Sequence, residues 1–363
     1  MVRIYNNSFS ENRQLHVIFD FLRIICAIIV FLGHFRAVLA PTYSELYSPD
    51  IATKIFYFIS GFGHQAVIIF FFFSGYFIHG TIKRGIDNNE FYFSYYLLNR
   101  FFRFFIVLLP VLIITFFLDS IALSYSSVYH LGEVDGSVPP KEKVDISLII
   151  FIINLLSLQE LIGSHFGSNS PLWSLSFEFV YYLLWPFIIF FFLKRSVFFP
   201  ILVVFAIYLI NEKVILLLPC WMIGALFYHY KVVINKYLSV IVFLTVLICT
   251  RFVTFGVLED YALSLTFYLF VSSFSLYIRK SNVLKVGRIG ADLAKISFPL
   301  YAVHMPIVGF TFFVIESSSP DNHMLICLLS IIVTVFISVI LARMDGGHRT
   351  LTRYTIKLIG NKA

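Results

Sequence analysis

The sequence contains ten runs of apolar residues, of which the fifth to seventh are short, and these runs limit what the chain can fold into. A helix needs about 20 mostly apolar residues to cross a bilayer, where backbone polar groups must bond within the protein. The runs occupy residues 16–39, 55–79, 101–121, 174–193, 197–211, 213–230, 237–250, 259–279, 291–315 and 324–343. We therefore expect an all-α integral membrane protein with about ten transmembrane helices. The stretch 146–161 is also apolar, but Asn154 and Gln159 favour an interfacial or re-entrant segment.

The composition points the same way. Apolar residues make up 59% of the chain and charged residues only 13%, whereas a soluble domain is about a quarter charged. The four cysteines all fall in apolar runs without metal-like spacing, which favours packing roles over disulfides or metal binding. The first run follows a short basic stretch, as in a secretory signal, but it contains Arg23 and has no small-x-small cleavage site. We expect an uncleaved first transmembrane helix.

The positive charges predict an orientation. If the N-terminus is cytoplasmic, nineteen of the 27 Lys and Arg residues fall on the cytoplasmic side and six on the other, with Arg23 and Lys295 inside runs. Cytoplasmic loops of membrane proteins are enriched in such residues. Both termini are therefore expected in the cytoplasm. The net charge of +7 reflects this bias, so no nucleic-acid partner is expected.

The first run, "FDFLRIICAIIVFLGHF" at residues 19–35, carries Arg23 and His34 eleven positions apart. At about 100° per residue the two side chains share one helix face, roughly 16 Å apart along the axis. Asp20 lies three residues before Arg23 and can pair with it. Arg23 could instead snorkel to the inner interface while His34 caps the outer end. Ionisable groups inside a membrane usually line an aqueous or substrate pathway, which favours a functional role.

Four further motifs follow this pair along the chain. They are "FFFSGYFI" (71–78), "NRFFRFFIVLLP" (99–110), "PLWSLSFEFVYYLLWP" (171–186) and "ISFPLYAVHMP" (296–306). In this order, and with the spacing of Arg23 and His34, the sequence resembles the membrane acyltransferase-3 family, whose members O-acetylate cell-envelope polysaccharides. The resemblance covers most of the chain.

The resemblance has structural implications of its own. It implies one acyltransferase-3-like transmembrane domain over residues 1–363, commonly of ten spans with a cytoplasmic N-terminus. The chain looks like the stand-alone branch, without a fused extracytoplasmic SGNH hydrolase-like domain. One departure is the sequence "ARMDGGHRTLTRY" after the last run, where many members carry a Glu-Lys-Pro-like stretch.

Several residues near the cytoplasmic ends of the runs suit a donor site. Ser74 and Gly75 allow close approach of a ligand or, equally, of a neighbouring helix. Arg100 and Arg103, one turn apart, suit phosphate binding, although ordinary positive-inside anchoring explains them too. Lys295 could help to hold an anionic donor. The resemblance implies acetyl-coenzyme A, a polyphosphate, as the acyl-donor substrate, and no permanently bound cofactor.

The start of the fourth run is polar at the depth expected for His34. Trp173, Ser174, Ser176 and Glu178 lie there. An unpaired carboxylate one turn into a span is costly, so Glu178 needs a partner or a role. Trp173 could belong to the interfacial aromatic belt and Ser174 could cap the helix, which would leave Glu178 unexplained.

Two more candidates lie in the ninth run. Tyr301 and His304 are three residues apart and share a helix face. His304 could orient a catalytic partner or be a packing histidine. The remaining histidines lack spacing typical of a metal site, so no metal is expected.

Together these features predict an O-acyltransferase, most specifically an O-acetyltransferase. It would move acetyl from cytoplasmic acetyl-coenzyme A to a hydroxyl of a cell-surface or lipid-linked polysaccharide, such as O-antigen or exopolysaccharide, in the bacterial cytoplasmic (inner) membrane. His34 would be the general base, because a neutral imidazole near pH 7 accepts protons. Glu178 would orient it or hold the acceptor, and Arg23 would help Arg100 and Arg103 with the donor.

Other readings of the same residues stay open. His34 could carry the acetyl group covalently for part of the reaction. The alternatives to an enzyme are a transporter or flippase of a glycan precursor and a non-catalytic assembly or sensor protein of the envelope. No sequence pattern predicts an oligomeric state.

Overall fold

The computed structural model describes residues 3–6, 13–125, 144–194, 198–275 and 280–359. Their contacts form two compact units. Unit 1 comprises residues 1–26, 64–93 and 177–294, and unit 2 comprises residues 27–63, 94–176 and 295–363. Among the charges that predicted the orientation, Lys141, Lys143, Arg195, Arg279 and Lys362 lie outside the described residues.

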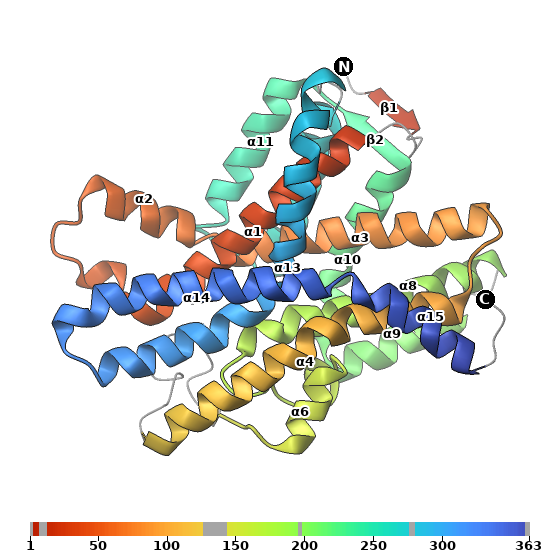
Figure 1. The fold of residues 1–363 in the computed structure, drawn as a ribbon. Coiled ribbons are helices and arrows are strands. Elements are labelled where there is room, and N and C mark those ends of the chain that lie inside the picture. The colour runs from red at the N-terminus through yellow and green to blue at the C-terminus, as the bar shows by residue number, and fades with distance from the viewer. Residues whose placement is uncertain (1–2, 7–12, 126–143, 195–197, 276–279, 360–363) are drawn as a thin grey trace. The chain divides into compact units, whose positions relative to one another are not determined.

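Helices form most of the described chain (Figure 1). In order, the elements are β1 (Arg3–Asn6), α1 (Arg13–Leu39), η2 (Tyr43–Glu45), α2 (Ile51–Ser60), α3 (Gly63–Asp87), α4 (Phe93–Tyr125), α6 (Leu148–Leu155), α7 (Gln159–Ile162), η3 (Ser170–Leu172), α8 (Trp173–Leu193), α9 (Phe198–Ile210), α10 (Glu212–His229), β2 (Tyr230–Val233), α11 (Lys236–Cys249), α12 (Val257–Ser275), α13 (Lys280–Glu316), η4 (Pro320–Asn322), α14 (His323–Met344) and α15 (Gly347–Ile359). The predicted helical membrane fold is confirmed. It also includes a small antiparallel ladder in unit 1, in which Arg3 of β1 pairs with Val233 of β2.

Seven helices of the described chain are long and apolar enough to cross a membrane. They are α1, α3, α4, α8, α10, α13 and α14, whereas α2, α9 and α11 are apolar but shorter. One predicted run, 55–79, is wrong in its extent because it crosses a helix break: α2 ends at Ser60 and α3 begins at Gly63. The count of ten spans and the cytoplasmic termini stay predictions.

The segment predicted to be interfacial or re-entrant forms two short helices, α6 and α7. Neither is long enough to cross a bilayer. The side chain of Asn154 is buried and binds the loop that follows, donating to the carbonyl of Ser164 and accepting from the backbone N–H of Phe166. Gln159 donates to the carbonyl of Leu172 at 2.7 Å. The two polar residues therefore hold this segment against the start of α8.

The core of unit 1 is built from aromatic rings. Phe19, Phe72, Phe73, Phe227 and Phe267 come from α1, α3, α10 and α12 and are almost completely buried. Contacting ring centroids are 4.9 to 6.3 Å apart, in tilted or edge-to-face pairs, which are the favourable geometries. Lipid is as apolar as these side chains, so close packing is what holds membrane helices together.

Helices α3 and α10 of unit 1 meet at two glycines. A Cβ atom on Gly75 would lie 1.9 Å from the carbonyl oxygen of Trp221. A Cβ atom on Gly224 would lie 1.9 Å from the carbonyl oxygen of Phe72. The two backbones are thus in direct contact, as in other membrane helix pairs with small residues at the crossing. Gly75 has a packing reason to be glycine, whatever its relation to a donor.

We expect Gly224→Ala to destabilise the protein by about 1–3 kcal/mol, because the added methyl group overlaps the Phe72 carbonyl and overpacking has costs of this size. Thermal unfolding of the purified protein in detergent measures the effect. Gly346→Ala is the control, since a Cβ atom at Gly346 meets no atom within 4 Å. Equal unfolding temperatures for the two variants would contradict the contact.

Candidate active site

His34 and His304 lie side by side in unit 2. His34 Nδ1 on α1 is 3.1 Å from His304 Nε2 on α13. The ring centroids are 5.1 Å apart and the ring planes differ by 33°. His304 is completely buried and His34 is half-buried. The structure thus brings together two histidines that the sequence places in separate motifs.

Hydrogen bonds to backbone carbonyls identify which nitrogen of each ring carries the proton. His304 Nδ1 is 3.1 Å from the carbonyl oxygen of Leu300, and His34 Nδ1 is 3.1 Å from that of Val30. A carbonyl oxygen only accepts, so both Nδ1 atoms are donors. In neutral His304 the Nε2 atom is then an acceptor, and it accepts from His34 Nδ1–H. Neutral His34 consequently carries its basic lone pair on Nε2.

A chain of hydroxyl groups joins the same turn of α13 to the start of α8. The Tyr301 hydroxyl donates to the carbonyl oxygen of Pro171 at 2.6 Å. Because this uses its one proton, the 2.6 Å bond between Ser174 and Tyr301 has Ser174 as the donor. Both residues are buried. Ser174 therefore holds the hydroxyl of Tyr301, and Tyr301 lies one turn before His304 on α13.

A proline creates a second link between these segments. Pro306 lies inside α13 and has no N–H, so the carbonyl of Ala302 lacks its usual helical donor. The side-chain amide of Asn169, in the loop before α8, donates to that carbonyl at 2.9 Å. Ala302 and Asn169 are both completely buried. The bond satisfies a carbonyl that would be costly to leave unpaired and fixes the loop two residues from His304.

The loop is held in turn by a buried carboxylate. Asp119 of α4 is completely buried, and its Oδ2 atom accepts from the backbone N–H of Ser168 at 2.7 Å. Gly167 has a φ of +58°, which favours glycine. Asp119 and Asn169 were not predicted from the sequence as site residues. A carboxylate in an apolar run and the turn-forming "GSNSP" segment were the available signals.

Ser176 has structural partners in unit 2. Its hydroxyl donates to the carbonyl of Ser157 at 2.9 Å and accepts from the backbone N–H of Glu160 at 3.4 Å. It therefore joins the first turn of α8 to the connection between α6 and α7. Trp173, the first residue of α8, is half-buried.

Glu178 and Ser74 belong to a hydrogen-bonded chain in unit 1. Trp221 Nε1 donates to Ser74 Oγ at 3.0 Å, Ser74 donates to the Tyr182 hydroxyl at 3.4 Å, and Tyr182 donates to Glu178 Oε1 at 2.5 Å. The carboxylate thus has a partner on its own helix. The expectation that Glu178 orients His34 stays a prediction.

Arg100 and Arg103 project from α4 in unit 2. Arg100 is buried, and its guanidinium carbon is 5.7 Å from the ring centroid of Tyr96. Arg103 is partly exposed, and its Nε atom is 4.0 Å from an oxygen of Asp345, directly after α14. The acidic residue that contacts Arg103 comes from the stretch where the sequence departs from the family pattern.

The other two predicted donor-binding cations, Arg23 and Lys295, come from other parts of the chain. Arg23 belongs to unit 1, where its guanidinium carbon is 5.9 Å from the ring centroid of Phe77. Lys295 begins the part of α13 in unit 2 and is exposed.

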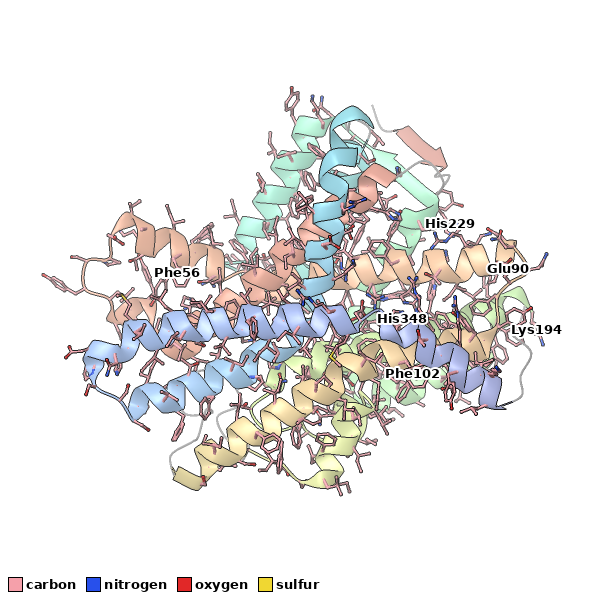
Figure 2. The ribbon with its side chains drawn as sticks, in the orientation of Figure 1. Phe56, Glu90, Phe102, Lys194, His229 and His348 are labelled. Atoms are coloured by element: carbon pink, nitrogen blue, oxygen red, sulfur yellow. The ribbon has the colours of Figure 1, made fainter. Side chains whose placement is uncertain are left out.

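Other histidines of unit 1 also have polar partners. Trp185 Nε1 donates to His79 Nδ1 at 2.9 Å, and His79 Nε2 is 2.7 Å from Nε2 of His229. His229, labelled in Figure 2, is the last residue of α10. His64 Nε2 is 2.7 Å from a carboxylate oxygen of Asp260. Over the part of the chain that the structure describes, no three His, Cys, Asp or Glu side chains are grouped to hold a metal ion.

Comparison with known families decides the class of protein. Residues 16–343 match the family model of acyltransferase 3, described as an acyltransferase domain. The chain belongs to the acyltransferase-3 family. The resemblance seen in the sequence is confirmed, and the protein is a multi-pass membrane acyltransferase. It matches no curated protein and no solved structure.

The bond between Asn169 and Ala302 can be tested with a compensating change. We expect Asn169→Ala to lower stability by about 1–3 kcal/mol, because a buried carbonyl loses its donor. Adding Pro306→Ala supplies a helical N–H to the same carbonyl. The double variant should therefore unfold at a higher temperature than the sum of the single changes predicts. Additive shifts would show that the carbonyl of Ala302 is not what Asn169 stabilises.

Proposed function

We propose that the protein is an O-acetyltransferase of the bacterial inner membrane, which moves acetyl from cytoplasmic acetyl-coenzyme A to a hydroxyl of a cell-surface or lipid-linked polysaccharide. Family membership supports acyl transfer. The observation that carries the choice of catalytic residue is the bond between His34 and His304, which leaves the lone pair of His34 on Nε2. An oriented imidazole of this kind suits general-base catalysis.

In this proposal His34 Nε2 removes the proton from the acceptor hydroxyl as the hydroxyl oxygen attacks the thioester carbonyl. The tetrahedral intermediate collapses, the carbon–sulfur bond breaks, and the imidazolium returns its proton to the departing thiolate. The products are the acetyl ester and coenzyme A. While His34 is charged, its Nδ1–H still points at two acceptors, the Val30 carbonyl and His304 Nε2, which stabilise the cation.

The neighbouring residues position this base. His304 holds the tautomer and orientation of His34 and needs no change of protonation. Tyr301 and Ser174 hold the turn of α13 that carries His304. On the acceptor side we place Trp173, whose aromatic face suits a sugar ring, together with Glu178, whose carboxylate is ordered by the hydrogen bond from Tyr182.

We assign the binding of the acyl donor to basic side chains. Arg100 and Arg103 are one turn apart on α4, which suits two contacts with the phosphates of coenzyme A. Lys295 and Arg23 are further candidates. The partial exposure of Arg103 and the long 4.0 Å contact with Asp345 are consistent with an arginine that exchanges this partner for a phosphate.

The first test replaces the histidines. We expect His34→Ala to reduce acetylation by at least a hundredfold, because general bases contribute about 10²–10⁴ to the rate. Membrane vesicles with labelled acetyl-coenzyme A and candidate glycans give the readout. His323→Ala, a histidine of α14 outside the pair, is the control. Normal acetylation by correctly inserted His34→Ala protein would refute the assignment, and glycan movement without coenzyme A would favour a transporter.

His304 should behave as a positioning residue. We expect His304→Gln to lower kcat with little change in the KM for acetyl-coenzyme A, since the base is misoriented while the donor site is intact. A purely structural role predicts loss of folded protein instead, which size-exclusion chromatography detects.

The second test concerns the donor. Arg103→Gln should raise the KM for acetyl-coenzyme A about tenfold or more, as expected when a charged hydrogen bond worth roughly 1.5–3 kcal/mol is lost. The salt dependence of the KM should also weaken. Arg349→Gln, which removes a cation from α15 of the same unit, is the control. An unchanged KM in Arg103→Gln would remove Arg103 from the donor site.

A further inference from the structure

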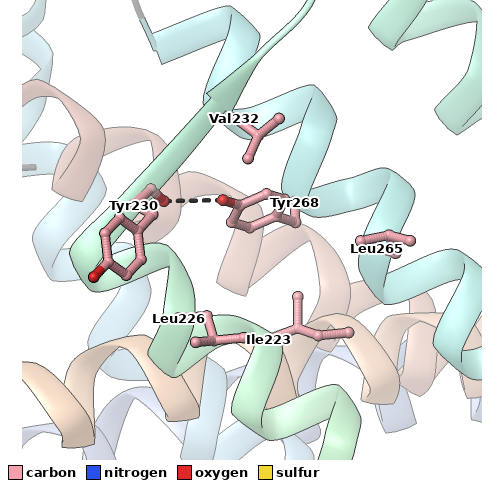
Figure 3. A pocket seen from close by; sticks show the side chains of 6 residues that line it. All are labelled: Ile223, Leu226, Tyr230, Val232, Leu265 and Tyr268. Carbon is pink, nitrogen blue, oxygen red and sulfur yellow. Dashed lines mark hydrogen bonds between the residues drawn. The ribbon is translucent and has the colours of Figure 1, made fainter. Parts of the chain in front are cut away.

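Unit 1 contains a cavity that the proposed reaction does not use. It has a volume of about 410 Å³, within the range of small-ligand sites. Its lining comes from the end of α10, from β2 and from α12 (Figure 3). The lining residues are Ile223, Leu226, Tyr230, Val232, Leu265 and Tyr268.

The lining selects hydrocarbon. Four of the six side chains are aliphatic, and none is charged. The Tyr268 hydroxyl donates to the backbone carbonyl of Tyr230 at 3.1 Å, so its proton is already used. Figure 3 shows the Tyr230 hydroxyl turned away from the aliphatic side chains. A sugar or a nucleotide would leave its polar groups unpaired here, whereas an acyl chain would not.

The position of the cavity suits a membrane lipid. Helix α10 is a candidate membrane span that ends at His229, so Ile223 and Leu226 belong to its last turns and Tyr230 follows directly. Tyrosine is typical of the membrane interface. Leu226 and Leu265 are 55% and 52% exposed, so the cavity opens outward from the protein. We expect this opening to face lipid in the membrane.

The charged residues next to the cavity in the chain are basic. No Asp or Glu occurs between Glu212 and Glu259. Lys231 follows Tyr230 on β2, with its ammonium group 6.0 Å from the Phe227 ring centroid, and Lys236 begins α11. Because Lys231 points away from Tyr230 and Val232, Lys236 is the lysine available to a head group, and an apolar cavity with a lysine nearby in the chain suits an acyl chain joined to an anionic head group.

We propose that this cavity binds an acyl chain of an anionic glycerophospholipid, whose phosphate lies against Lys236. The site is separate from the histidine pair and does not depend on the acyl-transfer chemistry. It would fix α10, β2 and α12 to the lipid leaflet at that end of the span.

Native mass spectrometry of the purified full chain in detergent tests the proposal, with phosphatidylglycerol and phosphatidylcholine added in parallel. The wild-type protein should retain phosphatidylglycerol preferentially. Leu265→Trp, which fills the cavity, should reduce this retention at least fivefold. Leu244→Trp is the matched control, because Leu244 is 45% exposed on α11 and lies outside the lining.

Neutralising the lysine tests the head group. Lys236→Gln should reduce the preference for phosphatidylglycerol about fivefold, the effect of one lysine near an anionic surface, and leave phosphatidylcholine retention unchanged. Lys231 is buried on the face of β2 opposite the cavity lining, so the half-buried Lys236 gives the decisive variant. Equal retention of both lipids by the wild type, or full retention by Leu265→Trp, would overturn the proposal.

Discussion

The geometry of the histidine site depends on one carbonyl group that its own helix cannot satisfy. A bilayer offers no water to pair with it, and Pro306 removes the N–H that would normally bond to Ala302. Asn169 takes over this role from the loop before α8. The same loop is anchored to Asp119, and it continues into Pro171, which binds Tyr301. A defect in helical hydrogen bonding is thus turned into the attachment that places α13, and with it His304.

The helices could be predicted from the sequence because apolar length is a strong signal, and it located the segments that carry the candidate residues. The start of α3 could not, since Gly61 and Phe62 interrupt a run that stays apolar on average. Within the site, residue type was enough to select four candidates: His34, His304, Tyr301 and Ser174. Their pairing was not predictable, because it depends on which segments pack together. Asn169 and Pro171 were harder still to predict as site residues. Asn169 donates to a backbone carbonyl, and Pro171 accepts a hydrogen bond through its own backbone carbonyl.

The structure also changes how the acidic and small residues are explained. Glu178 was singled out because a carboxylate in a span needs a partner, and Tyr182 supplies one within unit 1. Ser74 lies between Trp221 and Tyr182 in the same chain of donors, and Gly75 is in contact with backbone. Physical cost alone therefore accounts for these residue types. No catalytic or donor-binding role is needed to explain them, whereas the hydrogen bonds of the histidine pair fix which nitrogen of His34 carries the lone pair.

The anchoring of the two imidazole rings has a mechanical consequence. Each ring is bonded to a carbonyl four residues earlier in its own helix, so each moves with its helix as part of a rigid rod. The distance of 3.1 Å between His34 Nδ1 and His304 Nε2 therefore depends directly on the spacing between α1 and α13. A slide along either axis would weaken the bond, since hydrogen bonds weaken steeply once the donor angle falls below about 120°. The base would then lose its fixed orientation although the residues around it were unchanged. The alignment of α1 with α13 therefore determines the orientation of His34.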